Sequence, residues 1–262
     1  MFKYPYSFQS DIPAAIRAFQ SSIEKTTQRE IKTMSLHEVG WCYLIELDFA
    51  RSESTFQCLK QSSKWSRSFY SYLAMIATGA YGMFQLADDV CQIRNLFKKT
   101  SKSTQLDEFL NRRWNICPTD MIILRKTTIL FWKLLAYELL YLWNALPSCT
   151  KDALNIIIDD CQSLVSEMSM EPMIGLAKLI EGSCRCIMGS YEDGVSCFRI
   201  CLEKRKHLTH NCETAHVSAF AQFELGVLLT KNEEVLTSKI LKLFVIIFMF
   251  DIDLVFLYSL SF

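Results

Sequence analysis

The chain has 262 residues, of which half are hydrophobic and 13% aromatic, and this composition excludes a mainly disordered protein. Lysine plus arginine equals aspartate plus glutamate at 28 each, so there is no basic excess of the kind that holds nucleic acid or an anionic membrane. Only 8 glycines and 5 prolines occur, which favours long helices over a fold rich in turns.

The elements predicted along the chain are all helices. Asp11 is placed to cap the first one, and Pro13 lies in its first turn. An apolar stripe at helical spacing follows, formed by Ile12, Ile16, Phe19 and Ile23. Further helices are predicted over residues 35–49, 52–61, 66–79, 85–97, 119–145, 151–166, 172–189, 191–205 and 214–230. Short connections between most of them favour antiparallel helical hairpins.

Four regions are expected from these elements. Residues 1–97 form N-terminal helical hairpins with a repeat-like unit around 36–59, and residues 98–118 form a polar linker region. Residues 119–230 form C-terminal helical repeats, and residues 239–262 form a hydrophobic tail.

Two parts of the chain carry the same spacing of residues. In the first, Gly40 is followed twelve residues later by Ser52, and in the second Gly182 is followed by Gly194. An aromatic residue stands four positions further on in each. In the first unit, Leu36, Val39 and Tyr43 accompany Gly40 on the first helix, and the second helix carries the aromatic residue Phe56 and then Leu59. In the second unit the aromatic residue is Phe198. This spacing is typical of tetratricopeptide units, in which two antiparallel helices cross where only small side chains fit.

Partial matches accompany the two full ones. Ala15 and Phe19 fit the second helix of a unit, and Gly226 fits the first helix of another. Ser238 stands twelve residues after Gly226, but Lys242 occupies the position of the aromatic. A weaker unit is also predicted, through Met75, Ala87 and Cys91. The sequence therefore predicts an all-α, degenerate tetratricopeptide-type α-solenoid, with a generic helical bundle as the alternative.

Two stretches of the chain resemble the tetratricopeptide repeat protein 39 family, and its C branch most closely. The first begins with LHEVGWC at 36–42 and runs to KWS at 64–66. The second is FELGVLL at 223–229, followed by NEE at 232–234. The resemblance covers about residues 3–236. It implies an all-helical protein with a few degenerate repeats, no established catalytic activity, and roles in cilium assembly and lipid homeostasis that act through partners. Members of the family are roughly twice as long, so the chain is expected to be a short or alternative form with a foreign C-terminal tail.

The residues that resemble chemical motifs fit no reaction. Cys197, Cys201, His207 and His210 suggest a zinc site, but the two pairs are separated by too few residues for a zinc finger. His37-Glu38 begins like a zinc-protease helix, but Trp41 stands where the second histidine is required. We therefore expect no catalytic residues, no cofactor and no metal. The weakest alternative function is a helical enzyme whose active site matches no recognised motif.

The expected function is binding of other proteins in a groove lined by the first helices of the units. A clamp for a C-terminal carboxylate needs Lys three residues before the crossing glycine and Asn one after it, and these positions hold His37 and Trp41. An apolar groove is therefore expected, with Trp41, Tyr43 and Tyr72 as candidate anchors. Packing of these three aromatic residues in the core is the alternative.

Two further predictions concern the cellular location of the protein and its C-terminal tail. Eleven cysteines occur, several within apolar helical patterns, and the N-terminal MFKYP carries no secretion signal, so a cytoplasmic protein is expected. Lys239–Phe262 is long enough to span a membrane, but Asp251 and Asp253 would each cost roughly 2.5–3.5 kcal/mol there. We expect a tail that exposes apolar surface, and a membrane-associated protein held by this tail is the alternative function.

Overall fold

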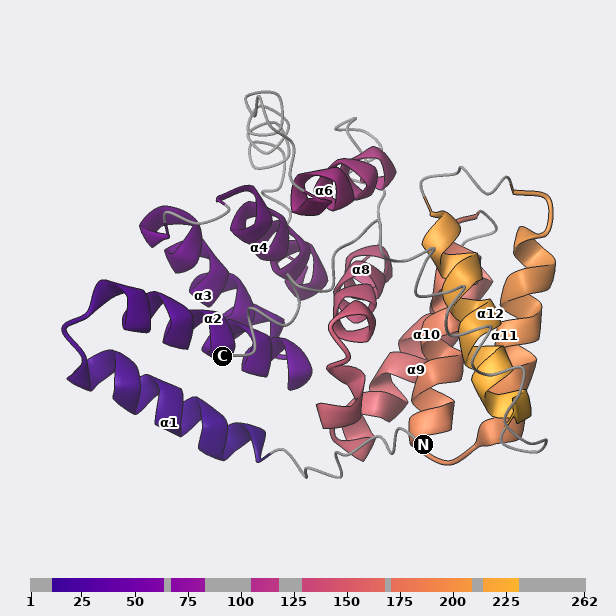
Figure 1. Cartoon of the computed structure of the whole chain (residues 1–262), viewed down its shortest axis with the longest axis horizontal. Helices are drawn as coiled ribbons and strands as arrows, with labels where there is room; N and C mark the ends of the chain where they lie inside the picture. The colour runs from indigo at the N-terminus through magenta and orange to yellow at the C-terminus, as the bar shows by residue number, and fades with distance from the viewer. Residues whose placement is uncertain are drawn as a thin grey trace. The chain divides into compact units, whose positions relative to one another are not determined.

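The computed structural model of the chain is helical throughout its described part (Figure 1). It describes residues 11–63, 67–82, 105–117, 129–167, 171–208 and 214–230. Within these ranges 86% of residues are helical and no strand occurs. The predicted all-α fold is confirmed. The helices fall into two compact units, which are described separately below.

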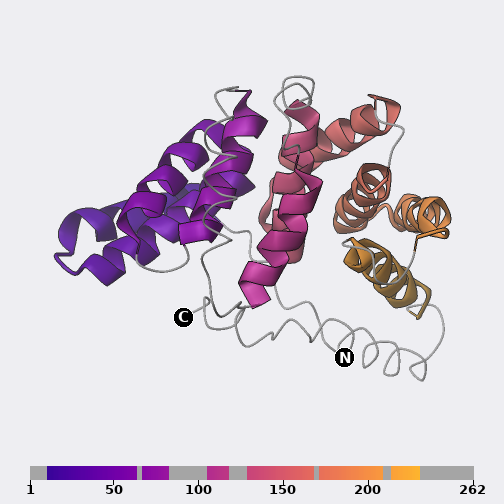
Figure 2. The same cartoon turned by 90° about the horizontal axis from the view of Figure 1, so that it is seen from above.

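Among the residues that the structure describes, the first unit has five helices, which pack mainly against their neighbours in sequence (Figure 2). They are α1 (Ile12–Lys25), α2 (Arg29–Ile45), α3 (Phe49–Ser62), α4 (Arg67–Tyr81) and α8 (Ile129–Leu142). A 3-10 turn, η1 (Leu146–Ser148), follows α8. Because the connections from α1 to α4 are only three or four residues long, successive helices run antiparallel and pack as hairpins.

Helix α1 begins as its sequence predicts. The Asp11 side chain accepts a hydrogen bond from the amide of Ala14 at 2.8 Å, and a proline occupies the first turn. Ile12 and Ile16 are buried against α2, where they share a core cluster with Val39. The polar side of α1 therefore remains in solvent while its apolar stripe anchors it to α2.

The described part of the second unit contains α6, α10, α11, α12 and most of α9. Their bounds are α6 (Gln105–Ile116), α9 (Lys151–Glu167), α10 (Met173–Ile187), α11 (Tyr191–Arg205) and α12 (Ala215–Thr230). Helix α10 packs against α11 and α12, and α11 packs against α12. None of the described helices combines the length and apolar character needed to cross a membrane.

Helix α6 lies inside the stretch that the sequence suggested as a polar linker. Leu110 and Arg113 are buried on one face of this helix, and Cys117 is buried just after it. The guanidinium of Arg113 lies 2.8 Å from Nε2 of His216 on α12. This spacing of three and four residues gives an otherwise polar helix one face that packs. The tail at 239–262, and Ala87 and Cys91 of the weaker predicted unit, lie outside the described residues.

Candidate partner-binding surface

The crossing of α2 and α3 places Gly40 directly against Phe56. A Cβ atom on Gly40 would lie 2.6 Å from Cε1 of Phe56, whose ring is fully buried. Ser52, on the same face of α3, donates its hydroxyl to the carbonyl oxygen of Gly40 at 3.3 Å. The two helices therefore approach closely because one residue has no side chain and the other has a small one. Val39 and Leu59 are buried beside the crossing, whereas Leu36 is half-buried.

The crossing of α10 and α11 has the same construction. A Cβ atom on Gly182 would lie 2.7 Å from Cε1 of Phe198. A Cβ atom on Gly194 would lie 3.1 Å from the carbonyl oxygen of Gly182 and 2.3 Å from Sγ of Cys186. Each position in this hairpin thus corresponds to the position 142 residues earlier, from 182 back to 40.

The turns of the two hairpins correspond as well. The amide of Asp48 donates to the carbonyl of Tyr43 at 2.9 Å, and the amide of Ser190 donates to the carbonyl of Arg185 at 2.9 Å. These bonds close equivalent helix ends, because each joins residues five apart around the last turn of the first helix. The correspondence therefore includes the backbone hydrogen bonds in addition to the side chains at the crossing.

A third close approach joins α4 and α8. A Cβ atom on Gly79 would lie 2.3 Å from Cγ of Trp132, which is fully buried. The sequence prediction did not include this crossing; it placed Met75, which is buried in α4 one turn before the glycine, in a weaker unit with Ala87 and Cys91. The aromatic partner was missed because it stands 53 residues after Gly79, well beyond the local spacing of the other hairpins. Gly226, the remaining predicted crossing residue, lies in α12.

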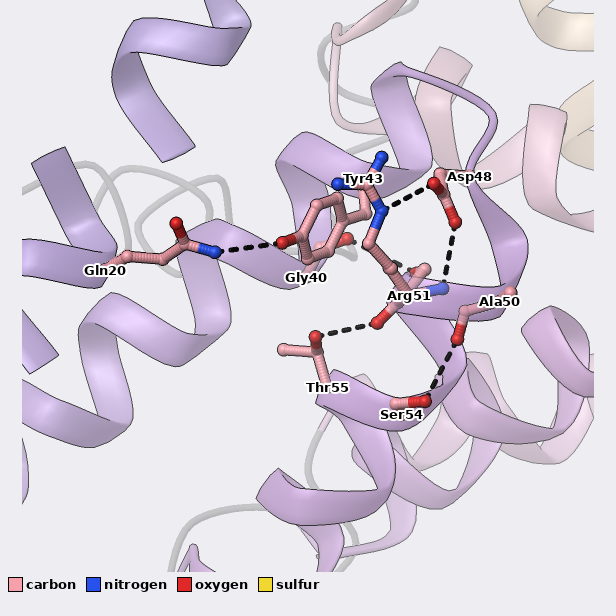
Figure 3. Close-up of polar contacts among 9 residues, drawn as sticks. Gln20, Gly40, Tyr43, Asp48, Ala50, Arg51, Ser54 and Thr55 are labelled. Carbon is pink, nitrogen blue, oxygen red and sulfur yellow. Dashed lines mark hydrogen bonds and ion pairs between the residues drawn. The ribbon is translucent and has the colours of Figure 1, made fainter. Parts of the chain in front are cut away.

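The three candidate anchors of the predicted groove are buried. The exposed fractions of Trp41, Tyr43 and Tyr72 are 7%, 6% and 1%. Figure 3 shows how Tyr43 is covered: Gln20 on α1 donates to its hydroxyl at 3.1 Å, and the guanidinium of Arg51 lies 4.6 Å from its ring centroid. These values favour the alternative, packing of the three aromatic residues in the core, over their use as anchors in a groove.

Trp41 is covered by an aromatic stack. The ring of Trp143, just after α8, lies between Trp41 at 5.3 Å and Phe69 of α4 at 5.7 Å, as measured between centroids. Trp143 itself is half-buried. The indole Nε1 of Trp41 is buried and has no hydrogen-bond acceptor in the described part of the chain. The face of α2 around Trp41 is thus filled by the protein's own aromatic residues.

His37 supplies no charge to this face. Its Nδ1 lies 3.2 Å from the hydroxyl of Tyr70, and its ring meets the edge of that aromatic ring. Burial lowers the pKa of His37 to about 4, so the imidazole is neutral at neutral pH. A neutral ring cannot replace the lysine of a carboxylate clamp, which agrees with the apolar groove expected from the sequence.

The outer end of the same face is exposed. Met34, His37 and Trp41 lie on one side of α2, because residues three and seven apart share a helix face. The exposed fraction of Met34 is 55% and that of Ile31, one turn earlier, is 39%. We call Ile31 and Met34 the α2 surface. It offers apolar contact area on the helix that a tetratricopeptide-type groove uses.

The buried guanidinium of Arg205, in the second unit, is satisfied within that unit. Arg205 is 2% exposed; its Nη1 donates to Glu171 at 2.9 Å, its Nη2 to the carbonyl of Thr214 at 2.8 Å, and its Nε to Ser218 at 3.0 Å. Glu171 in turn accepts from the amide of Gly175 at 3.1 Å. This network ties the start of α10 to the end of α11 and the start of α12, which is a structural role.

A second buried carboxylate, Glu181, joins α9 and α10. It accepts from Gln162 at 2.9 Å, from Lys178 at 2.7 Å and from Arg185 at 3.1 Å. Burial acts to raise the pKa of Glu181, but the hydrogen bonds from Lys178 and Gln162 outweigh it, and the pKa is lowered. The carboxylate therefore stays ionised, which suits an anchor of the helix packing better than a general acid.

The two cysteines of the zinc-like motif, Cys197 and Cys201, lie in the core. Burial raises the pKa of Cys197 to about 11 and that of Cys201 to about 12, so both thiols stay protonated. His207 is exposed at the end of the same segment, and His210 lies outside the described residues. In the part of the chain that is described, no group of three or more His, Cys, Asp or Glu residues is arranged to hold a metal ion.

The paired helices, the glycine-to-aromatic crossings and their repetition define a helical repeat protein of the tetratricopeptide type. The family described as Iml2/Tetratricopeptide repeat protein 39 matches residues 6–185, which is more than half of the chain. The chain therefore belongs to this family, whereas its closeness to the C branch stays a prediction. No solved structure matches the chain.

Proposed function

We propose that this protein is a non-catalytic scaffold that binds other proteins, and that the α2 surface is where a partner docks. The observation that carries the proposal is the exposure of Ile31 and Met34 on α2, the first helix of the α2–α3 hairpin. Apolar side chains exposed together on a groove-lining helix are the usual contact area for a bound segment.

The chemistry of the surroundings supports a partner segment that is apolar. His37 is neutral at neutral pH, and the inner end of the face is aromatic, at Trp41 and the half-buried Trp143. A ligand carboxylate would find no cation on this face of α2, while a leucine or aromatic side chain would find contact area on Met34 and the edge of the stack. The partner is therefore expected to present large apolar side chains rather than a C-terminal carboxylate.

The finer assignments are proposals that rest on the sequence alone. We expect a cytoplasmic protein whose effects on cilium assembly or lipid homeostasis pass through its partners. Its lack of catalysis is supported by the way the buried ionisable groups are used: Arg205 and Glu181 hold helices together, and the thiols of Cys197 and Cys201 stay protonated.

The alternative is a membrane-associated protein held by residues 239–262, which carry two apolar runs interrupted by Asp251 and Asp253. Alkaline carbonate extraction of cell membranes distinguishes the two functions. A scaffold without an anchor is released with the soluble fraction. Retention of the full chain, together with release of a variant lacking residues 239–262, would favour the anchor.

The scaffold proposal is tested by quantitative affinity purification from cell extract. The bait is the wild type, the double variant Ile31→Lys/Met34→Lys, or the control Ile156→Lys, which changes an isoleucine 48% exposed on α9. We expect a set of proteins retained by the wild type and the control and lost from the double variant. The same set on all three baits would show that the α2 surface is not the docking site.

A further inference from the structure

Two carboxylates lie beside the exposed apolar residues of the α2 surface. Glu30 precedes Met34 by four residues, and Glu38 follows it by four. Because residues four apart lie on the same side of a helix, these three side chains form one line along α2, about 12 Å long at the usual helical rise. Glu30 is exposed and Glu38 is half-buried. The apolar contact area is therefore bounded by an acidic residue one turn away at each end.

The cations of α2 do not neutralise this line of residues. The guanidinium of Arg29 donates to the carbonyl oxygen of Ser62, the last residue of α3. Lys32 lies two residues before Met34, so its side chain leaves α2 on roughly the opposite side. In the described part of the chain, neither of the two glutamates forms an ion pair. The α2 surface is thus both apolar and negatively charged.

The environment of Glu38 favours a cation supplied from outside. Burial raises the pKa of Glu38, so the fold removes part of the hydration of this carboxylate. Burial also raises the pKa of Tyr70, on α4, to about 12 and that of Cys42 to about 11, and the charge of Glu38 adds to both shifts. A partner's ammonium or guanidinium group beside Glu38 would stabilise the carboxylate more than at a fully hydrated site, because the local dielectric constant is lower.

We propose that the partner segment at the α2 surface is a basic amphipathic helix, with a lysine or arginine one turn before and one turn after a large apolar residue. A helix lying along α2 has the same rise per residue. Its two cations therefore reach Glu30 and Glu38 while the apolar residue between them contacts Met34. The inference rests on the proposed scaffold function and adds the charge and the spacing that the partner must have.

The spacing is tested by selection from a phage-displayed library of random peptides, each long enough for four helical turns. The full chain is the target, and the double variant Ile31→Lys/Met34→Lys is used to remove peptides that bind elsewhere. We expect enrichment of peptides with a large apolar residue and a lysine or arginine four residues to each side. Acidic or uncharged peptides, or no enrichment, would overturn the inference. Cations two residues from the apolar residue would indicate an extended segment and would overturn the helix.

The role of the charges is tested with one selected peptide, labelled with fluorescein and titrated with the full chain by fluorescence anisotropy. At about 0.05 M salt, Glu30→Gln/Glu38→Gln should weaken binding at least fivefold. At about 0.5 M salt the difference should shrink to less than twofold, because salt screens the attraction. Equal binding by this variant and the wild type at low salt would reject the basic partner.

The matched control is Glu46→Gln/Glu53→Gln, which removes the same net charge. Glu46 directly follows α2 and Glu53 lies near the start of α3, so both are at the turn end of the hairpin, and both are half-buried. This control should bind the peptide within twofold of the wild type at either salt concentration. Circular dichroism of all variants should show unchanged helix. A loss in the control as large as in Glu30→Gln/Glu38→Gln would mean that only the net charge matters, which would overturn the site.

The inference and the scaffold function can fail separately. Partners lost in the affinity purification from both the Ile31→Lys/Met34→Lys bait and the Glu30→Gln/Glu38→Gln bait would support both. Partners lost only from the first bait would leave the scaffold function in place and reject the basic helix. The same partners on every bait would reject the α2 surface as a docking site, and the inference with it.

Discussion

Leu47 and Gly189 occupy the same position in their two hairpins and share a left-handed backbone, with φ of 58° and 90°. In both hairpins this residue directly precedes the one whose amide closes the end of the first helix, Asp48 or Ser190. The second hairpin uses the residue that adopts this conformation without cost, whereas the first holds a leucine in it. The turn geometry is therefore set by the helix crossing and not by the residue at the turn.

Gly189 and Gly194 should respond differently to alanine. A Cβ atom on Gly189 would meet nothing within 4 Å, so Gly189→Ala should cost only the conformational penalty of about 1 kcal/mol. Gly194→Ala should cost more, because its Cβ would lie 3.1 Å from a backbone oxygen and 2.3 Å from Sγ of Cys186. Urea unfolding of both variants measures the difference, and equal losses would mean that the α10–α11 crossing is loose.

The contact between Gly40 and Phe56 should appear as a coupling energy. Gly40→Ala should destabilise the fold, because the new Cβ would lie 2.6 Å from the phenylalanine ring. Phe56→Leu removes the ring atoms that clash, so the double variant should be more stable than the sum of the two single losses predicts. A double-mutant cycle in urea unfolding measures this. Additive effects would mean that the two residues do not touch.

The three aromatic residues at the crossings should each be costly to remove. Phe56, Trp132 and Phe198 are fully buried, so each change to alanine should lower the free energy of unfolding by about 3–5 kcal/mol. Tyr81, which is 55% exposed on α4, is the control, and Tyr81→Ala should change it by less than about 0.5 kcal/mol. Similar small effects at all four positions would contradict the packing described.

His37 should make stability depend on pH. Its pKa is about 4 in the fold and 6.5 when unfolded, so below pH 6.5 the unfolded chain binds a proton that the folded chain excludes. The contribution of the neutral, buried His37 to stability is therefore fully present above pH 6.5. It is lost as the pH drops from 6.5 toward 4, by about 3 kcal/mol over that range. The difference in unfolding free energy between wild type and His37→Gln, measured from pH 7 to pH 4.5, isolates this contribution. A difference that does not change with pH would contradict it.

The contacts that follow from short spacings can be predicted from the sequence, and those that depend on distant segments cannot. Gly40 with Phe56 and Gly182 with Phe198 are sixteen residues apart, so one local pattern places both members. The partner of Gly79 is Trp132, and no local pattern contains both. The same limit explains the groove: whether Trp41 is an anchor or a core residue depends on Trp143, about a hundred residues later.

The polar stretch that holds α6 shows a second limit. Helix α6 is polar on average, so its composition indicates a linker, and its order depends on buried contacts such as the one between Arg113 and His216. The candidate partner surface has a similar origin. Ile31 and Met34 resemble many other apolar residues in helices, and only the arrangement of neighbouring helices leaves them exposed.

The connection between α4 and α8 interleaves the two units along the chain. Helix α6 is made between them, yet it belongs to the other unit. During synthesis, α2, α3 and α4 leave the ribosome before α8. The contacts of Gly79 with Trp132 and of Phe49 with Tyr137 therefore form only after α6, which belongs to the second unit, has been synthesised. No single cut in the chain separates the units either. A fragment limited to the first unit would need residues 83–128, which include α6 of the second unit, replaced by a short turn.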